Sequence, residues 1–545
     1  DTSDDGVNLM RSRSSRLGDI VHSSPAFVGS PISGWPDTGF FGTSGAPYSS
    51  YQASLQSAPR KAMVYVGAND GLLHGFDAGN GEQLLAYAPS ATASTDFGSG
   101  LHHLTESNYN HRYYVDGQPI TADVFIKSDA TAAAAWKTIL IGSLRGGGRG
   151  IYALDVTNPT QYQNTQSAAK NTLLWEFTDQ DDTDLGYTFS EPEVTMMNNG
   201  QWAVILGNGY NSDSGVAKLM IVFIEQGVDG QWSAGDYIKL NTGIGSAVDK
   251  NGLSTPALFD ANEDGVTDRI YAGDLKGNMW AFDVSDTSAA NWGAANGSSP
   301  LFTTQASQAI TMKPLVVKPA SSWINENAAN IPNVMVYFGS GQYVSSADAI
   351  SNTQQSFYGV WDSGIAVPTS RLVQQSLRSG FAGNKRVLTT NEVSLDNISA
   401  AGDLGWFINL PESGERVIVD AFTLEGLVFF NTMTPSVVPC AAGGSSWLMA
   451  VDMKTGGNPE IVAFDSSGDG TLDSSDEVTD GSATTGLAGM AFDHGIASAT
   501  AVISTKSGDT FGYTSGTNST KPIKAPLPGS GVTTGGRRSW TQLFN

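Results

Sequence analysis

The sequence of 545 residues has few cysteines, few basic residues and no long apolar run. With Cys440 as its one cysteine, the chain forms no intrachain disulfide, so stability has to come from the core, with bound metals as a further source. The chain has 29 Lys and Arg and 53 Asp and Glu, which gives a formal net charge of -24. This charge argues against nucleic-acid binding, because neutralising phosphates needs a basic surface. No stretch reaches the roughly 18 apolar residues of a membrane helix, so no direct membrane span is expected. Residues 1–19 are polar and are interpreted as a lead-in segment.

Glycine is abundant instead, and short apolar segments repeat along the chain. The 63 glycines and the 15% of charged residues indicate many short strands joined by tight turns. An apolar segment that ends in an acid recurs at Asp77, Asp155, Glu225, Asp283, Asp362 and Asp452. A β-rich segment with a following turn precedes each of them, which predicts a hairpin of two antiparallel strands. A further strand candidate lies before each of these six pairs, as at 416–422, and a seventh candidate at 495–503 brings the number of similar modules to seven.

Seven modules of three to four antiparallel strands predict an all-β fold, a single seven-bladed β-propeller over residues 20–545. Less regular segments at 287–309, 319–332 and 364–414 are interpreted as insertions on its rim. A strand from one terminus is expected to close the ring, and the sequence leaves open which one. The repeated Asp is expected to end its strand and to cap the turn that follows, because a catalytic residue is rarely needed in every copy.

An acidic loop in the fourth module predicts a metal site. Its oxygen donors are Asp260, Asn262, Asp264, the Val266 carbonyl and Asp268. Their spacing matches the start of an EF-hand loop, with Gly265 at the sharp turn, but Tyr271 stands where an EF-hand has its closing Glu, so Asp268 has to close the site. Like charges held this close repel unless a cation lies between them, and oxygen-only ligands favour calcium over zinc or copper. The alternative is a solvated Asp-rich turn.

A second acidic loop has similar spacing. Its candidate ligands are Asp465, Ser467, Asp469, the Thr471 carbonyl, Asp473 and Asp476. Asp476 occupies the position of the closing carboxylate, so a second calcium ion is predicted here, with a turn as the alternative. The acidic run at 178–187 lacks the glycine and the alternate spacing, and it is interpreted as a solvated turn.

An ordered series of motifs along almost the whole chain points to a family. The series includes "SRLGDIVHSSPAFVG", "VYVGANDGLLHGFDAGNGE", "GGGRGIYALDVTNP", "DLGYTFSEP" and "YAGDLKGNMWAFD". It resembles the C-terminal propeller domain of the PilC/PilY family of type IV pilus biogenesis factors. The resemblance implies that the family's calcium loop lies at Asp260 to Asp268, whose residue types all match, whereas the second loop rests on spacing alone.

The resemblance also implies a function. The expected protein is secreted by a Gram-negative bacterium and located at the pilus or the outer-membrane surface. It is expected to support pilus assembly against retraction, twitching motility and adhesion. Pilus subunits or minor pilins are the expected partners, with host or abiotic surfaces as further ones. The variable N-terminal region of the family is not part of this sequence, and no RGD tripeptide occurs.

Two other functions compete with this one. A quinoprotein-like dehydrogenase is also a propeller, but such enzymes commonly have a disulfide of adjacent cysteines over the quinone, and Cys440 is alone, so no enzymatic activity is expected. A scaffold propeller would need neither calcium nor pili. The histidines at 74, 102, 103 and 111 are irregularly spaced and are interpreted as ordinary polar or packed residues. The glycine-rich "RGGGRG" at 145–150 is interpreted as a hairpin, with an anion cradle as the alternative.

Overall fold

A computed structural model of the chain describes residues 11–529, apart from 12, 14, 32, 38–39, 42–44, 97, 130, 325–331, 382, 397–401, 437–442, 481–482 and 506–508. The chain divides into two compact units. Unit 1 comprises Asp1–Ile270 and Phe282–Gly293, and unit 2 comprises Tyr271–Ala281 and Ala294–Leu543. Cys440, most of the polar lead-in at 1–19 and the C-terminal tail lie outside the described residues.

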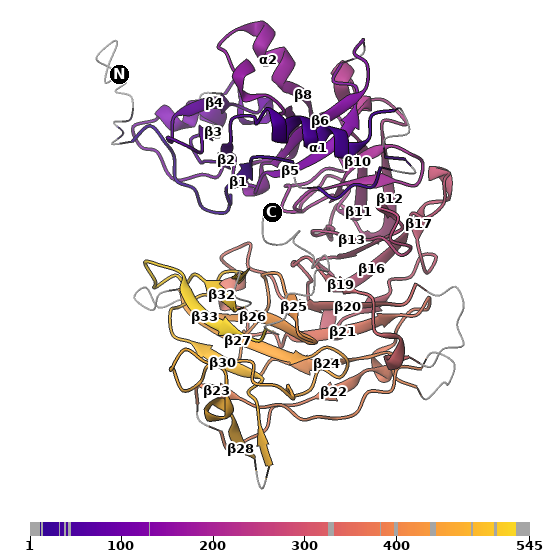
Figure 1. Ribbon diagram of the computed structural model, residues 1–545, viewed down its shortest axis with the longest axis vertical. Helices are drawn as coiled ribbons and strands as arrows, with labels where there is room; N and C mark the ends of the chain where they lie inside the picture. Colours follow the sequence, from indigo (N-terminus) through magenta and orange to yellow (C-terminus); the bar gives the residue numbers. More distant parts are fainter. Residues whose placement is uncertain are drawn as a thin grey trace. The chain divides into compact units, whose positions relative to one another are not determined.

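Unit 1 contains three sheets whose strands follow one another in chain order (Figure 1). The first sheet is β1 (Ala26–Val28), β2 (Met63–Gly67), β3 (Leu73–Asp77) and β4 (Gln83–Tyr87). The second sheet is β5 (Ile120–Ile126), β6 (Ala135–Ser143), β7 (Gly150–Asp155) and β8 (Leu173–Thr178). The third sheet is β9 (Glu193–Met197), β10 (Trp202–Gly207), β11 (Val216–Phe223) and β12 (Tyr237–Gly245), and β14 (Val266–Thr267) is added to β9.

The next sheet along the chain has the order β13 (Ala257–Phe259), β15 (Arg269–Gly273), β16 (Asn278–Asp283) and β17 (Gly293–Ala294), with β18 (Phe302–Thr303) also paired to β16. The connection from β13 to β15 is the first acidic loop. Because β14 lies inside that connection and pairs with β9, the loop is shared by two consecutive sheets.

Unit 2 contains two five-stranded sheets, a three-stranded sheet and a hairpin. The first has the order β19 (Leu315–Val317), β20 (Val334–Gly339), β21 (Ser356–Asp362), β24 (Gly405–Asn409) and β22 (Val373–Gln375). The second has the order β23 (Lys385–Arg386), β30 (Gly489–Phe492), β27 (Gly444–Asp452), β26 (Leu427–Pro435) and β25 (Phe422–Leu424). The third is β31 (Ala501–Ser504), β32 (Thr510–Thr514) and β33 (Ile523–Leu527), and the hairpin is β28 (Val478–Asp480) with β29 (Ala483–Thr485).

Helices are short. The α-helices are α1 (Tyr48–Ser57) and α2 (Gln166–Thr172). Short 3-10 helices of three to six residues span Ser90–Thr92, Gly100–Thr105, Arg145–Gly147, Pro159–Gln161, Gln226–Asp229, Ala289–Asn291, Gln305–Ser307, Ser321–Trp323, Asp348–Ile350, Thr369–Arg371 and Ser474–Asp476. Among the described residues, no helix is long and apolar enough to cross a membrane.

Aromatic side chains cover the first acidic loop from one side. The segment between β1 and β2 carries Trp35 and Phe41, whose rings stack 5.3 Å apart and meet the Trp202 ring edge-on at 5.0 and 5.7 Å. Val266 of β14 is buried in the same core. A Cβ on Gly265 would come within 3.1 Å of the Phe41 ring, so the loop fits closely against this segment. One side of the loop therefore packs against apolar side chains of unit 1.

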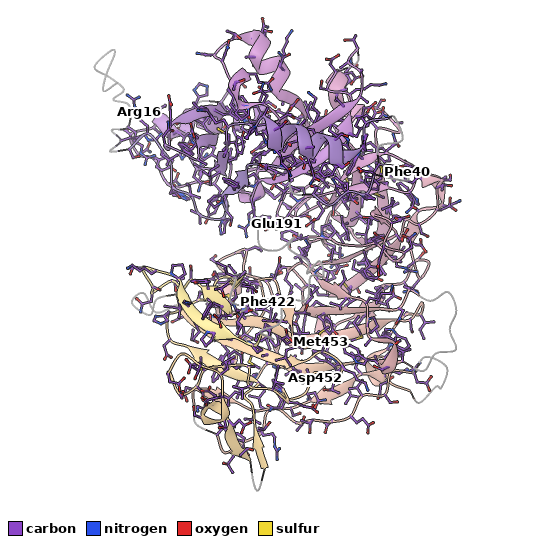
Figure 2. The ribbon with its side chains drawn as sticks, in the orientation of Figure 1. Arg16, Phe40, Glu191, Phe422, Asp452 and Met453 are labelled. Carbon is purple, nitrogen blue, oxygen red and sulfur yellow. The ribbon has the colours of Figure 1, made fainter. Side chains whose placement is uncertain are left out.

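The all-β prediction and the repeated hairpins are confirmed. The predicted acids end β3, β7, β16, β21 and β27, and each strand pairs with the strand before it. Each Asp caps its own turn. Asp452, which Figure 2 labels, is one example, because its Oδ1 accepts the Thr455 N–H at 2.7 Å. The degenerate copy differs, because β11 ends at Phe223, two residues before Glu225.

Two sequence interpretations need correction. The segments 287–309 and 364–414 are not only insertions. The first supplies β17 and β18 to the sheet of β16, and the second supplies β22 and β24 to the sheet of β21 and β23 to the sheet of β30. The physical reason is that Trp406 and Ile408 of β24 are fully buried, so these apolar side chains drive the strand into the sheet. The strand predicted at 416–422 begins only at Phe422, and Arg416 forms an isolated bridge with Met433.

Candidate metal centre

The first acidic loop folds around its own carboxylates. Asp260 accepts the backbone N–H of Asp264 at 3.2 Å and that of Gly265 at 2.7 Å. Asn262 Oδ1 accepts the same Asp264 N–H at 2.9 Å, and Asp264 Oδ1 accepts the Val266 N–H at 2.9 Å. Gly265 has φ +90°, a left-handed conformation that a glycine adopts without strain. The side-chain oxygens predicted at alternate positions are thus gathered along one tight turn.

Asp268 anchors the end of this loop. Its N–H donates to the Phe259 carbonyl at 3.0 Å, and its Oδ2 accepts the Ala261 N–H at 3.0 Å. Its Oδ1 accepts from the Asn198 side-chain amide at 3.1 Å. The side chain is 7% exposed, so the carboxylate faces the loop rather than bulk solvent. The residue that has to close the site is therefore held in place from both sides.

The electrostatics of Asp268 fit a cation site. Burial raises the pKa of this carboxyl, and the charges of Asp260 and Asp264 raise it further, against hydrogen bonds from Asn198 and Ala261 that lower it. A divalent cation would offset both the burial and the repulsion. Within the described ranges, no three His, Cys, Asp or Glu side chains form an ion-holding group by themselves. The fit to calcium therefore rests on the donor set, which also includes the Asn262 side chain and the Val266 carbonyl, and on the path of the loop.

The second acidic loop repeats this arrangement in unit 2. Asp465 accepts the N–H of Gly468 at 2.6 Å and that of Gly470 at 2.8 Å. Asp476 is fully buried, and its Oδ1 accepts the N–H groups of Ser466 and Ser467 at 2.7 and 2.8 Å. The final acid of each loop thus binds the amide that follows the first acid, so Asp476 takes the place that Asp268 has in the first loop.

The remaining predicted ligands of the second loop cap local groups. Asp469 Oδ1 accepts the Thr471 N–H at 2.9 Å, and Asp473 Oδ1 accepts the Ser475 N–H at 2.7 Å. Hydrogen bonds from Ser475 lower the pKa of Asp473. The Ser467 hydroxyl donates to Asp465 at 3.3 Å. These carboxylates accept hydrogen bonds along one turn, and calcium would bind them in the deprotonated form.

The acidic run at 178–187 is arranged differently, and its interpretation as a solvated turn is wrong for two of its acids. Asp182 and Asp184 are each 8% exposed. Lys239 lies 2.7 Å from both carboxylates, and Lys218 lies 2.5 Å from Asp184. Lysines that are distant in the sequence supply the positive charge here.

Asp184 gives a prediction on acid stability. Burial raises its pKa, but hydrogen bonds from Lys218, Lys239 and Ser214 outweigh burial and lower the pKa from 3.8 to about 2. A lowered pKa stabilises the fold above the unfolded value, and the contribution is lost as the pH falls through the folded value. We expect Asp184→Asn to lower the melting temperature by a few degrees at pH 7, with the gap to wild type closing between about pH 4 and 2. Asp213→Asn, which removes a more exposed partner of Arg149, is the control, and a gap for Asp184→Asn that stays constant with pH would contradict the prediction.

The other sequence candidates have polar partners outside the acidic loops. His74 Nε2 lies 3.1 Å from both oxygens of Asp70, His103 pairs with Glu106 at 3.1 Å, and His111 pairs with Asp19 at 2.8 Å. These histidines therefore have separate polar partners, as the irregular spacing predicted. The glycine-rich segment forms the β6–β7 hairpin, in which Arg149 pairs with Asp213 at 3.0 Å.

Sequence reasoning missed Asn198, which lies in the β9–β10 hairpin of the neighbouring sheet. Its amide touches the first loop although 62 residues separate it from Asp260. The local sequence "MNNG" signals only a turn, so pairing of β14 with β9 is what reveals the contact.

A family model described as PilY1 beta-propeller domain matches residues 17–395. The chain is 36% identical over 521 residues to the type IV pilus biogenesis factor PilY1 of Pseudomonas aeruginosa strain PAK, covering 87% of this chain and 41% of that protein. A PilY1 homolog of Xylella fastidiosa is 34% identical over 464 residues, covering 84% of this chain and 34% of that protein. The chain thus spans well under half the length of these relatives.

One solved structure is similar over most of the chain. The crystal structure of the Pseudomonas aeruginosa PilY1 C-terminal domain matches with a TM-score of 0.68 and 30% identity, covering 89% of this chain and 96% of that one. The match extends over the all-β fold described above, and the relatives are named as pilus biogenesis factors. The resemblance to this family is therefore confirmed, and the chain belongs to the PilY1 β-propeller family.

Proposed function

We propose that this chain is a calcium-binding, pilus-associated protein that supports type IV pilus assembly against retraction, twitching motility and surface adhesion. Its membership in the PilY1 family supports the pilus role. The first acidic loop supports the calcium role, because its buried closing carboxylate is close enough to Asp260 and Asp264 for their charges to raise its pKa, a repulsion that calcium would offset. The proposed role is non-catalytic, and pilus subunits or minor pilins are the proposed partners, with host or abiotic surfaces as further ones. The proposed location is extracellular, on the pilus or the outer-membrane surface of a Gram-negative cell.

We further propose that residues 20–545 form one seven-bladed propeller, with a rim insertion at 319–332. The described residues form seven sheets of three to five strands, in chain order, and this supports the number of blades. A crystal structure of the chain would test whether the seventh sheet closes the ring.

Each acidic loop is proposed to hold one calcium ion. In the first loop the ligands would be Asp260, Asn262, Asp264, the Val266 carbonyl and Asp268. In the second loop they would be Asp465, Ser467, Asp469, the Thr471 carbonyl, Asp473 and Asp476. The shared position of Asp268 and Asp476 supports treating the loops as two versions of one site.

Counting bound calcium tests this proposal. We expect the wild-type protein to bind two ions per chain and the Asp260→Ala, Asp264→Ala double variant to bind one, because the second loop shares no ligand with the first. Isothermal titration calorimetry after chelator treatment would give the number of sites. A double variant that binds no calcium would reduce the second loop to a turn, and a wild-type protein that binds none would overturn the calcium role.

A further inference from the structure

The side-chain amide of Asn198 connects the first acidic loop to the neighbouring sheet of unit 1. Its nitrogen Nδ2 lies 3.1 Å from Asp268 Oδ1, 3.0 Å from the Thr267 carbonyl and 3.0 Å from the Val284 carbonyl. Two of these acceptors belong to the end of the loop, and Val284 follows β16. One side chain therefore contacts the closing carboxylate, the backbone just before it and the backbone just after β16.

The chemistry of the contact fixes how the amide points. All three acceptors are oxygens, so the NH2 end of Asn198 has to face them. An NH2 group has two hydrogens, and three acceptors therefore share them. The carbonyls of Thr267 and Val284 are backbone atoms, so they hold the amide in a defined place. The movable acceptor is the Asp268 carboxylate, which has to align with an amide that the backbone positions.

The surroundings of Asn198 are rigid. β14 pairs in parallel with β9, with Val266 opposite Met196 and Thr267 opposite Met197. The hydroxyls of Thr195 and Thr267 lie 2.7 Å apart in a buried position. The hairpin that carries Asn198 and the end of the acidic loop are thus joined by backbone pairing and by side chains. Asn198 can therefore hold the Asp268 carboxylate in a defined position relative to β9 and β14.

We propose that Asn198 is a positioning residue for calcium at the first acidic loop, which rests on the calcium role proposed above. Its amide holds Asp268 Oδ1, while the Ala261 N–H holds Oδ2, so the carboxylate is aligned before an ion arrives. The two donors also reduce the repulsion of Asp268 by Asp260 and Asp264 when no ion is bound. Partners of this kind, behind a metal ligand, typically contribute tenfold or more to metal affinity.

Calcium affinity of Asn198→Ala tests this inference. Both variant and parent carry Asp469→Ala, which removes an exposed ligand of the second loop, so that calorimetry follows the first loop alone. We expect Asn198→Ala to weaken calcium binding by about 10- to 100-fold. The neighbouring Asn199 is the matched control, because its amide donates to the Gln201 side chain at 2.7 Å inside the same hairpin. Asn199→Ala should leave the dissociation constant within about twofold of the parent, as expected for a residue without contact to a ligand.

A second measurement separates positioning from simple stabilisation. The melting temperature in chelator reports the stability of the protein without calcium, and the dissociation constant reports the site. Asn198→Leu keeps the side-chain volume without the donor and replaces the alanine variant if that one does not fold. A lower melting temperature in chelator with an unchanged dissociation constant would overturn the positioning role. A parent with Asn198 intact that binds no calcium would overturn the calcium role itself, so the two failures are distinguishable.

Discussion

Replacing Arg386 by Met is expected to lower the free energy of unfolding of unit 2 by about 3–5 kcal/mol, the usual result of leaving one partner of a buried ion pair uncompensated. Arg386 is 4% exposed and Glu415 is fully buried. The guanidinium donates two parallel hydrogen bonds to the Glu415 carboxylate, at 2.6 and 3.0 Å. Methionine has a similar length and no charge, so the variant removes the charge with little change in volume.

The surroundings of this ion pair explain why the remaining carboxylate would be costly. The Thr432 hydroxyl and the Glu412 N–H donate to Glu415 at 2.6 and 3.1 Å, but both donors are neutral. The Arg386 guanidinium also lies 3.8 Å from the centre of the Trp447 ring, a cation–π contact that the variant loses. The cluster joins β23 to β26 and β27, so its loss weakens one whole sheet.

Thermal unfolding measures this effect. A loss of this size corresponds to about 2–4 °C of melting temperature per kcal/mol for a unit of some 250 residues. Lys385→Met is the matched control, because Lys385 is the adjacent residue of β23 and donates to the Ser466 hydroxyl at 3.1 Å, so it should cost less than about 1 kcal/mol. The Arg386→Met, Glu415→Leu double variant should recover part of the stability, since an apolar pair avoids the buried Glu415 charge, whereas Glu412 still loses its bond from the guanidinium at 3.1 Å. Equal losses for Arg386→Met and Lys385→Met would contradict the argument.

The repeated hairpins could be predicted from the sequence because their signals are local. Each module has a β-rich segment, a turn and an apolar segment that ends in Asp, and these features lie within one or two dozen residues of chain. The Asp-capped turn is equally local, as with Asp77, whose Oδ1 accepts the Gly79 N–H at 2.8 Å. The alternate oxygens of the acidic loops follow from spacing alone, so their candidate ligands could also be named in advance.

The contacts that could not be predicted join residues far apart in the sequence. Lys218 and Lys239 neutralise Asp184 from strands of the same sheet, and the acidic run by itself looks solvated. Asn198 and the Asp268 carboxylate meet because β14, inside the acidic loop, joins the sheet of β9. Arg386 looks like a surface residue of a short segment, and burial beside Glu415 depends on strand order in unit 2. These contacts depend on strand register and strand order, and a local sequence pattern predicts neither of them.

Asp268→Ala is expected to abolish calcium binding at the first acidic loop while the protein stays folded. The side chain supplies the carboxylate that closes the proposed site. Without it, the side-chain ligands that remain are those of Asp260, Asn262 and Asp264. The backbone of residue 268 still pairs with the Phe259 carbonyl and the Val284 N–H, so β14 and its neighbours retain their hydrogen bonds. Binding stabilises the folded state by about 2.7 kcal/mol when calcium is at a hundredfold excess over its dissociation constant. Calcium should therefore raise the melting temperature of the wild-type protein more than that of the variant.

In cells, the same variant tests whether calcium switches pilus function. Asp268→Ala should change the number of surface pili, measured in sheared fractions, and twitching, measured as the spreading of colonies, with the amount of exported protein unchanged. Glu263→Gln is the control, because it removes one negative charge from the loop at a position outside the alternate series of ligands. If Asp268→Ala is degraded or unfolded, calcium is a structural requirement rather than a switch. If it folds, fails to bind calcium at the first loop and leaves pili and twitching unchanged, the switch is wrong, because occupancy of the site would then have no consequence for the pilus.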